Sequence, residues 1–516
     1  MKKIITILLA VVSLLCFVSC KDGNADDGGT VKLNVANLYM QNIDDEYTEY
    51  IEDKFNVSLS GKQYSWADWD SQVTSAINGN NMPDVFHWNL DYNTFPTLKR
   101  WVKGGSLKAL PDLSAYPNIK RCVEACTAVE NMKINGKLYG IPLIKNPQDT
   151  GLNFNEFTYV YRKDWVKKLV QIDSARYSHL LKDDNVFTYD EFEEMLYAFK
   201  ENDLAGNNKT VALADVEWSY PSVANYFIDA PYSYVYDDAQ NKYVWNYTTQ
   251  KFTDGLNKAK KYVTDGVYWQ DQYSSKEGGA LTKFKSGVVG CYFENVILTN
   301  YDSIRKEFKA NNPTADVDDA CSLMHLKRAD GKFVYEGGYN WYSVTLFSAD
   351  TSDVKMKKML EIMDWLLGEE GTKLATYGLK DVDYTENDDG TINLLWTKKT
   401  NGEYAKKKIG AQYLRYTASI GYDIAQNNPL IGDKTKEAYN KWNGDVRKFI
   451  EDGDAYVMPL YLDMNWKTSK NKDNYAGLRN EAKSAMVEYT FGKGGWDEFN
   501  KQSKEKYESV LSEING

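Results

Sequence analysis

The spacing of apolar residues divides the first part of the chain into short elements. Apolar residues at alternate positions predict a strand over residues 31–38 (VKLNVANL). An amphipathic pattern predicts a helix over 44–55, and a β-rich segment follows at 57–64. The order strand, helix, strand is typical of an α/β lobe.

Further elements continue this alternation. A helix is predicted from position 66 or 68 to about position 78, and a short strand over 85–88 follows it. Residues 133–143 (KINGKLYGIPL) combine an Asn-Gly turn with alternating apolar residues. This combination predicts a β-hairpin.

Two helix starts are marked by polar residues. Residues 159–169 (YVYRKDWVKKL) are predicted to form a strand that enters a helix, and Arg162 and Asp164 suit a charge pair that fixes the start of that helix. Thr188, with Glu191 three residues later, predicts a capping box at the start of the next helix.

The chain begins with the parts of an export signal. Two lysines precede an apolar run that is too short to span a bilayer as a mature helix, and a small residue stands just before Cys20. This resembles the lipobox of bacterial lipoproteins; Phe17 stands where Leu is usual, and Cys16 fits less well because a bulky residue precedes it. We predict a signal peptide over 1–19, and a lipidated Cys20 that begins a flexible tether over 20–30.

Chain length and net charge limit the architectures and the binding partners that the sequence allows. After the tether, about 485 residues are left, which is too many for one core and predicts two lobes. Loss of residues 1–19 removes two lysines, so the formal net charge goes from -11 to -13. This acidic balance argues against nucleic acid as a partner.

The aromatic residues are mostly those with a polar edge. The chain has 39 Tyr and 14 Trp against 19 Phe. Such rings suit ligands with both apolar faces and hydroxyls, and carbohydrates are the commonest of these. The alternative is that Tyr-rich surfaces are general in the proteome of origin.

Seven segments in order resemble one family. They are NxMPDVF, NGKLYGIPL, YRKDWVKKL, TYDEFEEMLYAFKENDLAGNN, FKSGVVGCYFEN, DWLLGEEGTKLATYGLKDVDYT and FGKGGWDEFNKQSKEKYESVLSEI. The chain resembles the extracellular solute-binding lipoproteins of carbohydrate ABC importers, in their long form of about 500 residues. The resemblance implies an α/β, two-lobed periplasmic-binding-protein fold of the maltodextrin-binding type (type II).

The resemblance also implies lobe boundaries, partners and a location. The first lobe is expected over 31–146 plus about 321–350, and the second over 147–320 plus about 351–516. The protein would be a monomer anchored to a bacterial membrane by lipid at Cys20. It would capture a carbohydrate of oligosaccharide length outside the cytoplasmic membrane and deliver it to the permease subunits. No cofactor is implied.

Several candidate ligand-binding residues lie at predicted strand ends, because ligands of α/β sheets bind beyond the carboxyl ends of the strands. Others lie near the start of the helix predicted from position 66 or 68, and so near a lobe edge, or follow the two glycines at 337–338. A sugar packs its C–H face on Trp or Tyr, and its hydroxyls bond to polar side chains. The alternative for each residue is a place in a core or at a helix cap. The candidates are Trp66, Trp69, Trp88, Trp218, Tyr292, Glu294, Tyr339 and Trp341.

Catalytic and metal-binding patterns are weak. A lipid-anchored glycoside hydrolase is the alternative function, but carboxylate pairs are inevitable among 73 acidic residues, and the three histidines are scattered. Some relatives carry a calcium loop where this chain has Asp203 to Lys209; the residues here supply too few oxygens, so no calcium is expected. Cys122 and Cys126 could form a strained bridge, whereas Cys291 and Cys321 suit buried thiols.

Overall fold

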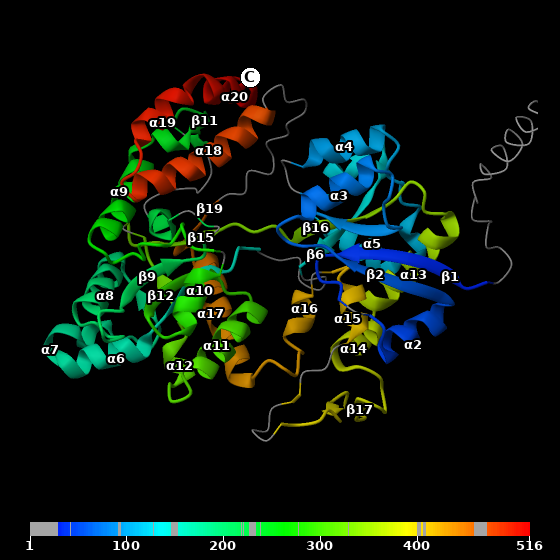
Figure 1. The fold of residues 1–516 in the computed structure, drawn as a ribbon, viewed down its shortest axis with the longest axis horizontal. Coiled ribbons are helices and arrows are strands. Elements are labelled where there is room, and N and C mark those ends of the chain that lie inside the picture. The colour runs from blue at the N-terminus through cyan, green and yellow to red at the C-terminus, as the bar shows by residue number, and fades with distance from the viewer. Residues whose placement is uncertain are drawn as a thin grey trace, which may run out of the picture.

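The computed structural model describes most of the 516 residues. The exceptions are residues 1–28, 42, 91–93, 127, 146–152, 218, 220, 227–233, 238, 277, 329, 400–403, 406–408, 420 and 459–471. Two lobes lie side by side, each built on its own sheet (Figure 1). Among the described helices, none is long and apolar enough to cross a membrane.

The first lobe is built on a five-stranded sheet of order β2-β1-β3-β16-β6. Its strands are β1 (Val31–Asn37), β2 (Val57–Gln63), β3 (Val85–Trp88), β6 (Gly140–Ile144) and β16 (Trp341–Phe347). Its helices are α2 (Glu46–Phe55), α3 (Trp69–Asn78), α4 (Phe95–Lys103), α5 (Pro117–Ala125), α13 (Asp353–Leu367), α14 (Glu369–Tyr377) and α15 (Gly410–Arg415). Strands β1, β2 and β3 are parallel, and β16 runs antiparallel to β3 and β6.

Local signals account for several of these elements. Strand β1 alternates buried and exposed residues at its start, as a strand with one covered face should. Asp45 caps α2 by accepting a hydrogen bond from the backbone N–H of Thr48. The predicted hairpin is present as β4 (Lys133–Ile134) and β5 (Lys137–Leu138), and Asn135 and Gly136 both have positive φ in its turn.

The second lobe is built on a four-stranded sheet of order β13-β7-β12-β9. Its strands are β7 (Phe157–Tyr161), β9 (Val211–Asp215), β12 (Val289–Asn295) and β13 (Ser322–Leu323). Its longer helices are α6 (Lys163–Ile172), α8 (Tyr189–Glu201), α9 (Gln250–Thr264), α10 (Gly279–Lys285), α11 (Leu298–Asn311) and α17 (Asp433–Glu451). The predicted capping box of α8 is confirmed, because Thr188 and Glu191 bond reciprocally.

A third, smaller core extends the second lobe. The hairpin of β10 (Tyr234–Asp237) and β11 (Lys242–Trp245) packs with α18 (Lys472–Thr490), α19 (Trp496–Gln502) and α20 (Lys504–Asn515). These helices lie at one end of the lobe (Figure 1). The remaining short elements are α7 (Ser174–Tyr177), α12 (Val317–Ala320), α16 (Tyr422–Ala425), β8 (Val186–Phe187), β14 (His325–Leu326), β15 (Phe333–Glu336), β17 (Tyr384–Glu386), β18 (Ile392–Leu394) and β19 (Ala455–Met458).

The chain divides between the lobes differently from the expected boundaries. Helices α13 and α14, expected in the second lobe, bury their apolar faces in the core of the first. Strands β13 and β15, expected in the first lobe, belong to the second, because β13 pairs with β7 and β15 packs in the second lobe's core. The return crossover therefore follows β15, near residue 337, and the last crossover lies between Ala418 and Ala425.

Candidate functional site

The carboxyl ends of several strands lie at one edge of the first sheet. Because β1, β2 and β3 are parallel, their carboxyl ends lie at this edge. Strand β16 is antiparallel to β6, and Trp341 at its start is opposite Ile144 at the end of β6. We call this the first-lobe edge; Tyr39 and Trp66 lie in the segments that leave it.

An equivalent edge exists in the second lobe. Strand β12 is parallel to β9 and antiparallel to β7, with Asn295 opposite Phe157. The carboxyl ends of β9 and β12 therefore meet the start of β7. We call this the second-lobe edge; it carries Glu156, Glu217 and Glu294.

The crossovers join these two edges. The chain leaves the first sheet at the end of β6 and enters the second at the start of β7. The return segment runs beside it: the N–H of Asn155 donates to the carbonyl of Glu336 at 2.8 Å, and the N–H of Lys145 donates to the carbonyl of Asn340 at 2.9 Å. Both edges therefore adjoin the hinge, where ligands of two-lobed proteins are enclosed.

The first-lobe edge carries an aromatic cluster of Tyr39, Trp66, Trp69, Tyr342 and Tyr416. The Trp66 ring centroid lies 5.9 Å from that of Tyr39, 6.0 Å from Trp69 and 6.3 Å from Tyr342, and Tyr39 lies 4.4 Å from Tyr416. The residue Trp66 is 57% exposed. Among the predicted candidates it therefore offers a stacking surface to a ligand.

Two other predicted tryptophans lie beneath this cluster. Trp69 is buried, and its indole N–H donates to the carbonyl of His87 at 3.1 Å. Trp88 is 2% exposed and packs on Trp101 with ring centroids 4.3 Å apart. Burial lowers the pKa of His87 to about 3. These residues support the edge from within the core.

The predicted pair Tyr339 and Trp341 lies beside the return crossover. Trp341 is 2% exposed, and its ring packs against Tyr339 at 5.6 Å and Phe95 at 6.3 Å. Tyr339 is half-buried. This arrangement places Trp341 in the core and leaves Tyr339 nearer the surface.

The predicted pair Tyr292 and Glu294 lies at the end of β12. The Tyr292 ring is buried against Phe284, and its hydroxyl donates to the Glu294 carboxylate. The N–H of Asn295 donates to the other oxygen of Glu294 at 2.8 Å. Burial raises the pKa of Glu294. The structure thus holds the Glu294 carboxylate at this edge in a partly desolvated position.

Other carboxylates at the second-lobe edge have structural partners. Glu217 accepts the N–H groups of Ala280 at 2.7 Å and Gly278 at 3.2 Å, so it binds the start of α10. Asp215 is fully buried and accepts two hydrogen bonds of 2.7 Å from Ser222. Burial raises the pKa of Asp215 to about 6. The predicted Trp218 lies outside the described residues.

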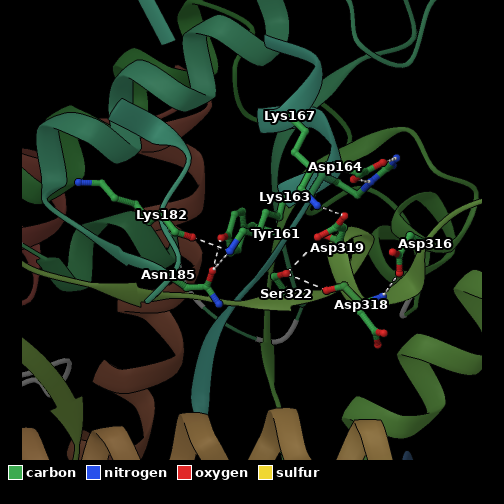
Figure 2. A network of polar contacts seen from close by, with 11 residues as sticks. Tyr161, Lys163, Asp164, Lys167, Lys182, Asn185, Asp316, Asp318, Asp319 and Ser322 are labelled. Carbon is green, nitrogen blue, oxygen red and sulfur yellow. Dashed lines mark hydrogen bonds and ion pairs between the residues drawn. The ribbon is translucent and has the colours of Figure 1, made fainter. Parts of the chain in front are cut away.

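A polar network lies at the opposite end of β7 (Figure 2). Arg162 bonds both oxygens of Asp164, at 2.7 and 2.6 Å, as predicted for a helix-start pair. Lys163 donates to the side-chain oxygen of Asn185 at 2.9 Å, and Lys167 pairs with Asp319. These contacts join α6 to its neighbours, away from the second-lobe edge.

The calcium-like loop and the cysteines have defined surroundings. The Asp203 carboxylate accepts the backbone N–H of Asn208 at 2.7 Å and the Thr210 hydroxyl at 2.8 Å, so the loop is closed by its own side chain. The described cysteines, Cys122, Cys126, Cys291 and Cys321, are buried and unbridged. Within the described part of the chain, no cluster of three or more His, Cys, Asp and Glu side chains could hold a metal ion.

Sequence reasoning missed three members of the aromatic cluster. Tyr39 follows the end of β1 and could have been found by the strand-end rule applied to the other candidates. Tyr342 stands next to a predicted residue. Tyr416 has no strand-end or turn pattern around it, and its segment was expected in the second lobe.

Comparisons with known proteins agree with this architecture. The chain is 24% identical over 447 residues to the polygalacturonan/rhamnogalacturonan-binding protein YtcQ of Bacillus subtilis, covering 84% of this chain and 81% of that protein. It is 24% identical over 332 residues to lipoprotein LipO of the same organism, covering 60% of each chain. No protein-family model matches the sequence.

A solved structure matches almost the whole chain. The S. pneumoniae ABC-transporter substrate binding protein FusA, in complex with kestose, superposes with a TM-score of 0.62 at 15% identity, covering 94% of this chain and 97% of that one. The chain therefore has the two-lobed α/β fold of the solute-binding proteins of ABC transporters, as the sequence resemblance implied.

Proposed function

We propose that the protein is the substrate-binding lipoprotein of an ABC transporter, which captures an oligosaccharide outside the cytoplasmic membrane and delivers it to the permease. The observation that carries this proposal is the aromatic cluster around the exposed Trp66 at the hinge-facing edge of the first lobe. Stacking on this cluster and hydrogen bonds from the second-lobe edge would hold a sugar between the lobes.

Reversible binding without turnover is the direct test. A ligand that binds only the folded protein at one hundred times its dissociation constant stabilises it by about 2.7 kcal/mol. A thermal-shift screen over mono- and oligosaccharides should find at least one stabilising sugar, and chromatography after long incubation should recover it intact. If the best ligand is cleaved, the transport-receptor hypothesis is wrong and the protein is a glycoside hydrolase.

The proposed anchor is tested separately. Replacing Cys20 with Ala should release the protein from membranes, because the acyl chains supply the apolar area for anchoring. The wild-type protein is the control, and both are fractionated after a salt wash. Retention of the Cys20→Ala protein in the membrane fraction would show that another part of the molecule anchors it.

A further inference from the structure

A pocket lies on the first lobe, away from the aromatic cluster. It has a volume of about 490 Å³ and lies between α2, the end of α13, α14 and β17. None of its lining residues belongs to the aromatic cluster. Its size is within the usual range for small-ligand sites, about 300 to 1,000 Å³.

Two aromatic rings form part of its wall. Tyr50 is 38% exposed, and Trp365 is half-buried. Their ring centroids lie 6.3 Å apart, with planes tilted by 36°. Phe55 meets Trp365 edge-on at 5.7 Å and supports it. The wall therefore combines aromatic surface with groups that can form hydrogen bonds, as carbohydrate ligands require.

A single carboxylate fixes the orientation of both rings. Glu370 accepts hydrogen bonds from the Tyr50 hydroxyl and the Trp365 indole N–H, each at 2.9 Å. Lys54 pairs with the same carboxylate at 3.1 Å and lies 5.1 Å from the centre of the Trp365 ring. Rings held in this way lose little freedom when a ligand stacks on them.

The charges around the pocket are balanced. Its lining contains the carboxylates of Glu369, Glu370 and Glu386. Three ammonium groups pair with them: Lys54 with Glu370, Lys373 with Glu369 and Glu386 at 2.7 Å each, and Lys380 with Glu386 at 3.8 Å. An ionic ligand would therefore find no excess of opposite charge.

We propose that this pocket is a second carbohydrate site, which takes a short neutral saccharide. The aromatic wall receives the C–H face of a ring, and the fixed carboxylates and ammonium groups bond to hydroxyls around it. Binding at this pocket does not depend on the ligand proposed between the lobes, so an experiment can contradict either proposed site without contradicting the other.

The test follows the indole N–H signal of Trp365 by NMR in full-length protein labelled with [15N]tryptophan, assigned with Trp365→Phe. Maltotriose, cellotriose and xylotriose are the neutral probes, and trigalacturonate is the anionic probe. At least one neutral trisaccharide should shift the signal saturably. Tyr50→Ala should weaken this binding at least fivefold, whereas the exposed second-lobe control Ile172→Ala should not.

The same titration is repeated in Trp66→Ala, where the response should persist. A response that disappears in this variant would mean that the signal reports binding between the lobes, and would overturn the second site. The proposal is also overturned if no probe shifts the signal, if trigalacturonate binds as tightly as the neutral probes, or if Tyr50→Ala binds unchanged.

Discussion

The two hinge-facing edges differ in chemistry. The first-lobe edge exposes Trp66 within a group of rings, whereas the second-lobe edge holds the largely buried Glu294 carboxylate beside Asn295. Under the proposed function, one lobe supplies apolar contact area and the other supplies directional hydrogen bonds. Neither chemistry alone matches a sugar, which has both faces and hydroxyls. Closure of the lobes is then what completes the site.

The largest expected effect distinguishes a tryptophan that stabilises the core of the first lobe from one that is exposed for ligand contact. Trp88→Ala should lower the free energy of unfolding by about 3 to 5 kcal/mol, because it removes a buried ring packed on Trp101. Trp66→Ala, which removes an exposed ring, is the matched control and should change it by less than about 1 kcal/mol. Denaturant titration measures both. An equally stable Trp88→Ala protein with weakened sugar binding would assign Trp88 to the ligand.

The contrast between Trp66 and Trp88 shows which features could be predicted from the sequence and which could not. The hairpin at 133–143 and the capping box at Thr188 follow from residues close in the chain, and both are present. The choice among tryptophans at strand ends could not be made this way. Trp66 and Trp88 both adjoin strand ends, and their different exposure depends on packing partners such as Trp101, which no pattern around Trp88 indicates.

The lobe boundaries predicted near residues 320 and 350 were wrong for the same physical reason, whereas the change of lobe after residue 146 agrees with the order of β6 and β7. Helix α13 has an apolar face built from Met, Leu and Ile residues, which could cover either sheet. Its sequence therefore predicts a helix and leaves its lobe undetermined. Because α15 and Tyr416 follow α13 into the first lobe, their contribution to the aromatic cluster was missed too.

A second prediction concerns acid sensitivity beneath the first-lobe edge. His87 is buried with its pKa lowered to about 3, so the folded protein keeps it neutral while the unfolded chain takes up a proton below about pH 6.5. Its contribution to stability is therefore complete above pH 6.5 and is lost as pH falls towards 3, by about 1.4 kcal/mol per pH unit. At pH 5 the loss should be roughly 2 kcal/mol.

The measurement is denaturant unfolding of wild type and His87→Gln between pH 7.5 and 4.5. The variant should lose less stability than wild type over this range. The second lobe supplies the comparison: burial lowers the pKa of His325 to about 4, although neighbouring Asp445 acts in the opposite direction, so His325→Gln should flatten the profile at the same pH values, by a smaller amount. Parallel profiles for wild type and His87→Gln would contradict the buried neutral state.

The third prediction tests the first-lobe edge as a binding surface. Trp66→Ala should weaken binding of the sugar found by thermal shift about tenfold, equivalent to roughly 1.4 kcal/mol, because the exposed stacking surface is lost. Calorimetric titration measures the affinity. The pocket variant Tyr50→Ala is the control and should keep the affinity of the site between the lobes. Unchanged binding by Trp66→Ala would remove the observation on which the proposed site depends.

The smallest effect should come from the second-lobe edge. Glu294→Gln keeps the shape of the side chain but replaces one accepting oxygen with an amide NH2 group, so sugar affinity should fall about threefold, or roughly 0.7 kcal/mol. Because the two oxygens also accept hydrogen bonds from Tyr292 and Asn295, the variant should lose some thermal stability as well. Glu217→Gln is the matched control at the same edge: its oxygens bind the start of α10, so it should lower the melting temperature and leave the affinity unchanged. Calorimetry and thermal unfolding on both variants separate the two roles. If Glu217→Gln weakened binding and Glu294→Gln did not, the carboxylate that meets the ligand would be Glu217, and the start of α10 would belong to the site.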